Sequence, residues 1–454
     1  MTTRKHHSAT IDVDGALTRD IDRPALPDGV RCPTRFAYWE GRQNPRFQRL
    51  RAAVLKLTGF DLLLPDEDAA AVCEDLFSGD PVAERFVDEV YHGETGPVQT
   101  RRMLERALSE GIGSLEDVPD SMRELFAEFE TIPDWVDPEL LEEGAAIWRR
   151  WGTMLFSFAG AETLEIYTES AVATPLSLAG GYAGDNALRR FLETCRFWMD
   201  VSEPGALLRP GSAGRATAMK VRVMHVSVRS RVASHDEWYI EKWGLPISQT
   251  YMALTLIAGS VTPGLALWAL GYQTSAREIR ALIHFQKYMG HLLGVRMKWY
   301  PETIGDSIRM LLMTILSRSF DSGEHGRELI ESYPQAFAAR EGHTGLQRLR
   351  EHYNFRINSV YSAMFMAPGT RKNYRMRERP PGGRGPGRGR SSPCPVSRSS
   401  PPWGGPAASR RSAACTSASC AGTARTGTGP RWPAARPPST PRAPCAADRH
   451  PRLQ

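Results

Sequence analysis

Apolar residues recur at intervals of three and four from Pro45 to about Phe129, in runs such as FQRLRAAVLKLTGF and VAERFVDEVYHG that Gly or Pro separates. This spacing gathers apolar side chains on one face of a helix. Further helical runs follow, among them PELLEEGAAIWRRWGTMLFSFAGAETLEIYTESA, NALRRFLETCRFWMDV, RATAMKVRVMHVSVRSRVAS and AREIRALIHFQKYMGHLLGV. No stretch sustains the alternation of a β-strand. The pattern predicts an all-α fold, with one large helical domain over residues 45–376.

Residues 245–276 carry no charged side chain over 32 positions, which is long enough to span a bilayer. Thr262-Pro263-Gly264 interrupts the stretch and leaves two pieces that are each too short to span. We therefore expect two buried core helices and no transmembrane span. Peripheral contact with a membrane stays open.

The two ends of the chain differ from the body in composition. Residues 1–44 begin polar, with scattered Pro and Gly, and are expected to form an extended arm. Residues 377–454 hold fourteen Arg, no Lys, two acids and 15 of the 33 Pro, with hardly any large aliphatic residue. Such a tail cannot bury enough apolar surface to order itself, so we expect it to be disordered. It is either a basic arm for an anionic partner or an out-of-frame extension of a GC-rich coding region.

The net charge of +6 is distributed unevenly between the body of the chain and its C-terminal tail. The tail carries +12, which leaves the body at −6 and removes the argument for a nucleic-acid partner. The body has three cysteines, Cys32, Cys73 and Cys195, with no pairing pattern, as suits a reducing compartment. The first 29 residues contain no apolar segment typical of an export signal, so we expect a cytoplasmic protein.

The sequence contains no metalloprotease, nucleophile-elbow or Gly-rich phosphate-binding motif. The remaining candidates for a functional site are histidines on predicted helices. His225 shares a helix face with Arg222 and Arg229. A haem would offer iron to the imidazole and two propionates to the arginines. The alternative is a basic surface stripe around a hydrogen-bonded histidine. His284 and His291, two turns apart, are expected to be core histidines rather than a metal site.

The ordered motifs from LRRFLETCRFWMDV through KVRVMHVSVRSR to EWYIEKWGLPISQTYMALTL and LIHFQKYMGHLLGV resemble the family of latex-clearing proteins and MpaB-type oxygenases, the rubber-oxygenase catalytic domain. The resemblance covers roughly Trp135 to Pro334, and more loosely the chain from Pro45. It implies an all-helical fold with a globin-like core and, as in the latex-clearing members, a non-covalent haem b.

The resemblance also assigns residues. It implies that His225 is the proximal iron ligand and that Arg190 and Thr194 match the Arg and Thr of the distal helix. Where rubber-cleaving members have a Lys just before that Thr, this chain has Glu193. The family's proposed catalytic Glu falls by count near Thr174 in this chain.

Glu169 is the nearest acid to that position, so the general base is expected to be Glu193 or Glu169. The expected function is a haem b-dependent oxygenase acting with dioxygen on an apolar, isoprenoid-like alkene. Aromatic residues and the uncharged stretch are expected to line the substrate channel, the aromatic set being Trp148, Trp151, Phe156 and Phe158. Glu193 and the missing export signal argue against rubber itself. A haem protein without turnover and a haem-free helical lipid-binding protein stay open as alternatives.

Overall fold

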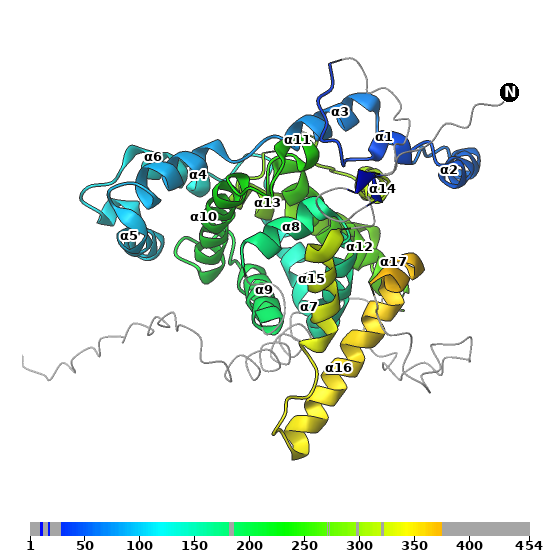
Figure 1. Ribbon diagram of the computed structural model, residues 1–454. Coiled ribbons are helices and arrows are strands. Elements are labelled where there is room, and N and C mark those ends of the chain that lie inside the picture. The colour runs from blue at the N-terminus through cyan, green and yellow to red at the C-terminus, as the bar shows by residue number, and fades with distance from the viewer. Residues whose placement is uncertain are drawn as a thin grey trace, which may run out of the picture.

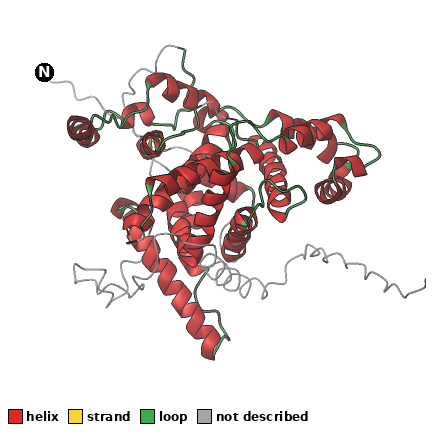
Figure 2. Cartoon of the chain, turned by 180° about the vertical axis from the view of Figure 1, so that it is seen from behind, coloured by secondary structure: helices red, strands yellow, loops and turns green. Residues whose placement is uncertain are grey.

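Almost all of the regular secondary structure in the described chain is helical (Figure 1 and Figure 2). The computed structural model describes residues 10–11, 17–18, 29–180, 186–269, 271, 273–296, 299–318 and 322–374, without the side chains at 10–11, 17–18, 151, 153–159, 161, 269 and 368. The β-structure in these residues is one antiparallel pair, β1 (Thr10–Ile11) and β2 (Leu17–Thr18). The all-α fold expected from the sequence is confirmed.

The first helices form the N-terminal third of the molecule: α1 (Tyr38–Gly41), α2 (Pro45–Thr58), α3 (Asp66–Asp75), α4 (Pro81–Phe86), the π-helical turn η1 (Val87–Tyr91), α5 (Gly96–Glu110), the 3-10 turn η2 (Ile112–Ser114) and α6 (Asp120–Glu130). The middle of the chain forms α7 (Pro138–Ile166), α8 (Ser170–Leu178), α9 (Ala187–Ser202), α10 (Ala213–Ala233), α11 (Ile240–Trp243), α12 (Gln249–Ala269) and α13 (Ala276–Leu292). The last helices are α14 (Ile304–Ser317), α15 (Gly323–Gln335), α16 (Gly345–Phe365) and α17 (Pro368–Asn373).

Helices α7, α12 and α13 pack together at the centre, with α4, α5 and α6 in a lobe on one side and α16 running outward (Figure 1). Gly144 lets α7 approach α13 closely, since a Cβ there would lie 2.4 Å from the carbonyl oxygen of Ala281. Phe285 and Tyr288 of α13 are fully buried in this core. A rigid centre of this kind holds the neighbouring helices α8, α9 and α10 in fixed positions.

Within the uncharged stretch, Gln249–Ala269 forms the single helix α12, so the expected break at Pro263 is wrong. Proline has no N–H to donate to the carbonyl of Gly259 four residues earlier. The side-chain amide of Gln286, on α13, donates to that carbonyl instead at 3.2 Å. A neighbouring helix therefore supplies the hydrogen bond that the sequence lacks.

Helix α12 is also long and apolar enough to cross a membrane, by length and composition only. Its most apolar window, within Gln249–Trp268, is 67% buried inside the molecule. That degree of burial is typical of a core helix, as the sequence predicted.

The N-terminal arm differs from the extended segment expected over residues 1–44. In its last part α1 forms, and Phe36, Tyr38 and Trp39 are buried in the main core. Aromatic side chains supply the apolar area that anchors this short segment. The tail at 377–454 lies outside the described residues.

Candidate active site

Helix α10 carries His225 near its middle, between two buried arginines. The hydroxyl of Ser212 caps the helix by accepting the N–H of Arg215 at 3.1 Å, and apolar residues fill its inner face. Helix α10 packs against α9, α8, α4 and α13. The imidazole is thus held on a rigid element rather than on a loop.

Arg222 is fully buried and paired with protein carboxylates. Its Nε and Nη2 donate to Asp80 at 2.7 and 2.9 Å, and Nη2 also donates to Glu128 at 2.6 Å. Asp80 in turn accepts the N–H of Ala83 at 3.3 Å, which caps α4. Of the three guanidinium nitrogens of Arg222, Nη1 is the one that is buried without a hydrogen-bond partner among the described residues. Arg222, which was expected to hold a propionate, therefore mainly links α10 to α4 and α6 through these ion pairs.

Arg229 has a partner at each nitrogen. Its Nη1 donates to Glu84 at 2.9 Å, and its Nε and Nη2 donate to the carbonyls of Pro246 and Ile247 at 3.2 and 2.6 Å. A propionate would have to displace these bonds. A propionate at Arg229 would therefore compete with contacts that the protein itself supplies.

His225 is different, because its Nδ1 is buried and has no hydrogen-bond partner among the described residues. Burial, and then the positive charge of Arg229, lower the pKa of His225 to about 4, while Asp80 acts in the opposite direction. The imidazole is consequently neutral at pH 7. A neutral, unpartnered imidazole is the form that binds a metal, so His225 fits the iron-ligand role.

Helix α9 presents the three residues expected on the distal side. Nη1 of Arg190 donates to Glu193 at 3.1 Å, as expected for acid and base three residues apart on a helix. Arg189 also pairs with Glu193, at 3.5 Å. Thr194 is exposed, and its hydroxyl donates to the carbonyl of Arg190 at 3.0 Å. About half of the Glu193 side chain remains exposed.

Glu169 is buried and caps the N-terminus of α8. Its Oε1 accepts the N–H of Ala171 at 3.2 Å, and the Ser170 hydroxyl lies 3.4 Å from the same oxygen. These contacts hold the carboxylate in place. Glu169 thus has a structural role in starting α8.

A partly buried carboxyl that the sequence interpretation missed, Glu162, lies on α7, seven residues before Glu169. Burial raises the pKa of Glu162 to about 8, against a hydrogen bond with Thr262 and the charge of Arg318. Arg318 also interacts electrostatically with Glu165 and Glu169. The available signal was the position of Glu162 within an apolar run, with further Glu residues three and seven positions on.

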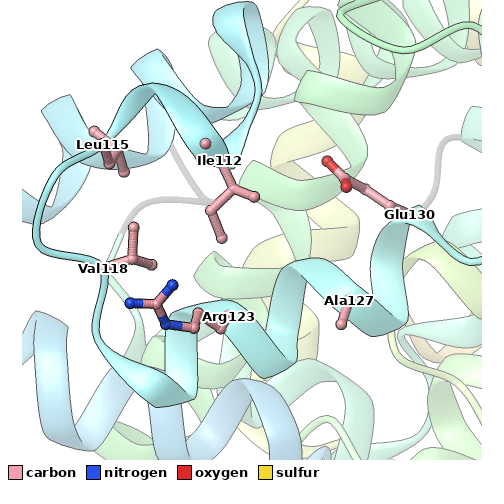
Figure 3. Close-up of a pocket in the computed structure, with 7 residues that line it drawn as sticks. Ile112, Leu115, Val118, Arg123, Ala127 and Glu130 are labelled. Carbon is pink, nitrogen blue, oxygen red and sulfur yellow. The ribbon is translucent and has the colours of Figure 1, made fainter.

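Two other candidate features are a pair of histidines on α13 and a surface pocket. His284 accepts the N–H of Asp137 at 3.0 Å and His291 contacts the carbonyl of Thr131 at 3.3 Å, so both are hydrogen-bonded as expected, but each is partly exposed and not enclosed in the core. No group of three metal-ligating side chains occurs among the described residues. A surface pocket of about 460 Å³ lies between η2 and α6 (Figure 3), and its lining is Ile112, Gly113, Leu115, Val118, Arg123, Ala127 and Glu130.

The predicted aromatic channel is described only in part. Trp148 is buried and stacks on Trp198 with ring centroids 4.4 Å apart. The side chains of Trp151, Phe156 and Phe158 lie outside the described residues. Gly152 in the same helix has φ 55°, a conformation that favours glycine, and it kinks α7 there.

Comparison with known proteins agrees with this fold. Residues 146–389 match the family model described as ER-bound oxygenase mpaB/B'/Rubber oxygenase, catalytic domain. A solved structure entitled "Structure of Latex Clearing Protein LCP in the closed state" is similar, with a TM-score of 0.50 and 19% identity over 68% of this chain and 78% of that chain. At that identity the likeness shows the fold alone. No curated protein matches the chain. The family match spans more than half of the chain, and the chain belongs to the mpaB/B' and rubber-oxygenase catalytic-domain family of oxygenases.

Proposed function

We propose that this chain is a haem b-dependent oxygenase that uses dioxygen to attack an apolar, isoprenoid-like alkene. The observation that carries the proposal is the partly buried, neutral imidazole of His225, whose buried Nδ1 has no partner among the described residues. Membership of an oxygenase family supports the reaction class.

The imidazole of His225 would hold the iron of the haem. Haem b supplies a redox-active iron that reacts with dioxygen. Arg229 contributes through its charge, because a cation beside His225 keeps the imidazole unprotonated and available as a ligand. Nη1 of Arg222 is the donor that remains for an anionic group.

Glu162 is better suited than Glu169 to move a proton. A carboxyl with a pKa of about 8 can take up or release a proton near neutral pH, as a general base or acid requires. Thr262, on α12, hydrogen-bonds this carboxyl and orients it. Glu169 has its oxygen engaged in capping α8.

On the distal helix, Glu193 holds Arg190 by an ion pair, and Thr194 returns its hydroxyl to the backbone. The pair sets the position of the arginine on this helix. A lysine in place of Glu193 would repel Arg190 and change the charge of this face. We infer that this difference shifts the substrate preference away from that of rubber-cleaving members.

The test is the visible absorption spectrum of the full chain expressed with ample haem precursor. The wild type should carry haem b, and His225→Ala should lose it while keeping its helical circular dichroism. His284→Ala is the matched control, because His284 is a half-buried histidine bonded to Asp137, and it should keep the haem. A colourless, folded wild type would instead favour a haem-free lipid-binding protein.

Oxygen uptake distinguishes an oxygenase from the second alternative, a haem protein without turnover. Sustained consumption of dioxygen with an isoprenoid alkene supports an oxygenase. Haem without any such consumption would favour a haem-binding protein that lacks turnover.

A further inference from the structure

Two cysteines that are far apart in the sequence meet in the structure. Sγ of Cys32 lies 2.8 Å from Sγ of Cys73, across a separation of 41 residues. Cys73 lies on α3 and is fully buried, whereas Cys32 precedes α1 and is partly exposed. No spacing pattern in the sequence pairs these residues, so the tertiary structure creates this pair.

Both sulfur-bearing segments are fixed by contacts with the region around α11 and α12. The N–H groups of Thr34 and Arg35 donate to the carbonyls of Glu241 and Lys242, each at 3.0 Å. Arg31 adds an ion pair with Glu241 at 2.5 Å. These bonds hold the segment that carries Cys32 along α11.

Helix α3 is held by α12 on the other side of the pair. The hydroxyl of Thr250 donates to the carbonyl of Val72 at 2.7 Å, directly beside Cys73. The N–H of Leu245 donates to the carbonyl of Leu76 at 2.8 Å. The two thiols are therefore presented to each other by a packed scaffold and not by a flexible loop.

We propose that Cys32 and Cys73 are a reversible dithiol–disulfide pair that clamps the N-terminal segment onto α3. Cys32 is the entry point, because it is the more accessible sulfur. Its thiolate attacks a small oxidised disulfide such as oxidised glutathione, forms a mixed disulfide and releases one glutathione thiolate. The thiolate of Cys73 then attacks the sulfur of Cys32 and expels the second glutathione.

This exchange conserves both electrons and protons. The protein loses two electrons and two protons, and oxidised glutathione gains them as two thiols. The product is one Cys32–Cys73 bond that closes the chain over α1 and α2. A reducing glutathione pool reverses the reaction.

The pair also borders the interior of the molecule. Tyr251, the residue after Thr250 on α12, is close enough to Cys32 and Cys73 for their charges to raise its pKa, together with burial and Glu169. Tyr251 packs against both the main core and the cluster around α8. Oxidation removes two ionisable thiols from this neighbourhood and ties the N-terminal segment down beside it.

The experiment is a redox titration of the folded full-length chain in mixtures of reduced and oxidised glutathione. After acid quenching and alkylation, trypsin releases Cys32 in a peptide of residues 32–35 and Cys73 in a peptide of residues 57–85. Mass spectrometry should show these two peptides joined, in a single transition that involves two electrons. Amide hydrogen exchange at Thr34 and Arg35 should slow on oxidation.

Variants distinguish this pair from the other cysteines. Cys32→Ser and Cys73→Ala should each abolish the joined peptides, whereas Cys195→Ala, at a buried cysteine on α9, should keep them. Two results would overturn the proposal in folded wild-type protein. One is that both sulfurs stay open to alkylation at every glutathione ratio. The other is that Cys32 stops as a mixed disulfide with glutathione while Cys73 remains alkylatable.

Discussion

The buried ion pair between Asp80 and Arg222 should be a main stabilising contact between α4 and α10. The side chains are 1% and 0% exposed, and two hydrogen bonds at 2.7 and 2.9 Å join them. Asp80→Asn keeps the shape of the side chain and the oxygen that caps α4. It removes the negative charge opposite the guanidinium. The substitution therefore tests the charge pair and spares the cap, which is worth about 1 kcal/mol.

The magnitude follows from the burial of both groups. Leaving one partner of a buried ion pair without its counter-charge costs about 3–5 kcal/mol. Arg222 keeps its hydrogen bond to Glu128, whose side chain is 27% exposed. We therefore expect Asp80→Asn to lower the free energy of unfolding by about 3 kcal/mol, near the lower end of that range. This corresponds to roughly a hundredfold change in the folding equilibrium constant.

The assay is urea unfolding followed by circular dichroism, in which the midpoint should fall with little change in slope. Glu124→Gln is the control, because it removes an exposed ion pair with Arg85. It should change the free energy of unfolding by no more than about 1 kcal/mol. Adding Arg222→Met to Asp80→Asn should recover part of the loss, since no buried charge is then left opposite the amide. An Asp80→Asn protein as stable as the Glu124→Gln control would refute the reasoning.

Three further predictions follow from the site and the tail. Glu162 has a pKa of about 8 in the folded state, against an ordinary value of 4.5. Between these two pH values the folded state binds a proton that the unfolded state has lost. The free energy of unfolding should therefore fall as pH rises through this window, by as much as ~1.4 kcal/mol per pH unit. Glu162→Gln should lack this slope in urea titrations, and equal slopes would contradict the burial of the carboxyl. Glu193→Lys should shift the ferric Soret band of the haem-loaded protein by breaking the pair with Arg190, and identical spectra across a pH titration would place residue 193 outside the pocket. Truncation after Met376 should leave the melting temperature and haem content unchanged, because the tail lacks core-forming side chains, and loss of folding would refute that composition argument.

The sequence by itself determined the features that depend on neighbours within a few residues. Apolar spacing at three and four predicted the helical fold, and it placed His225 in the middle of α10. The ion pair of Arg190 with Glu193 was predictable for the same reason, because residues three apart on a helix lie side by side. Local geometry is set by the backbone, so the sequence pattern alone specifies it.

The tertiary structure decided which distant groups meet. Arg222 and Asp80 are 142 residues apart, so no local pattern indicated that the guanidinium would be neutralised within the protein. Pro263 was expected to end a helix, but a side chain from α13 satisfies the carbonyl that the proline leaves without a donor. The meeting of Cys32 with Cys73 and the burial of Glu162 arise in the same way. Burial and long-range pairing set the charge state and the reactivity of these groups, and both properties exist only once the helices have packed.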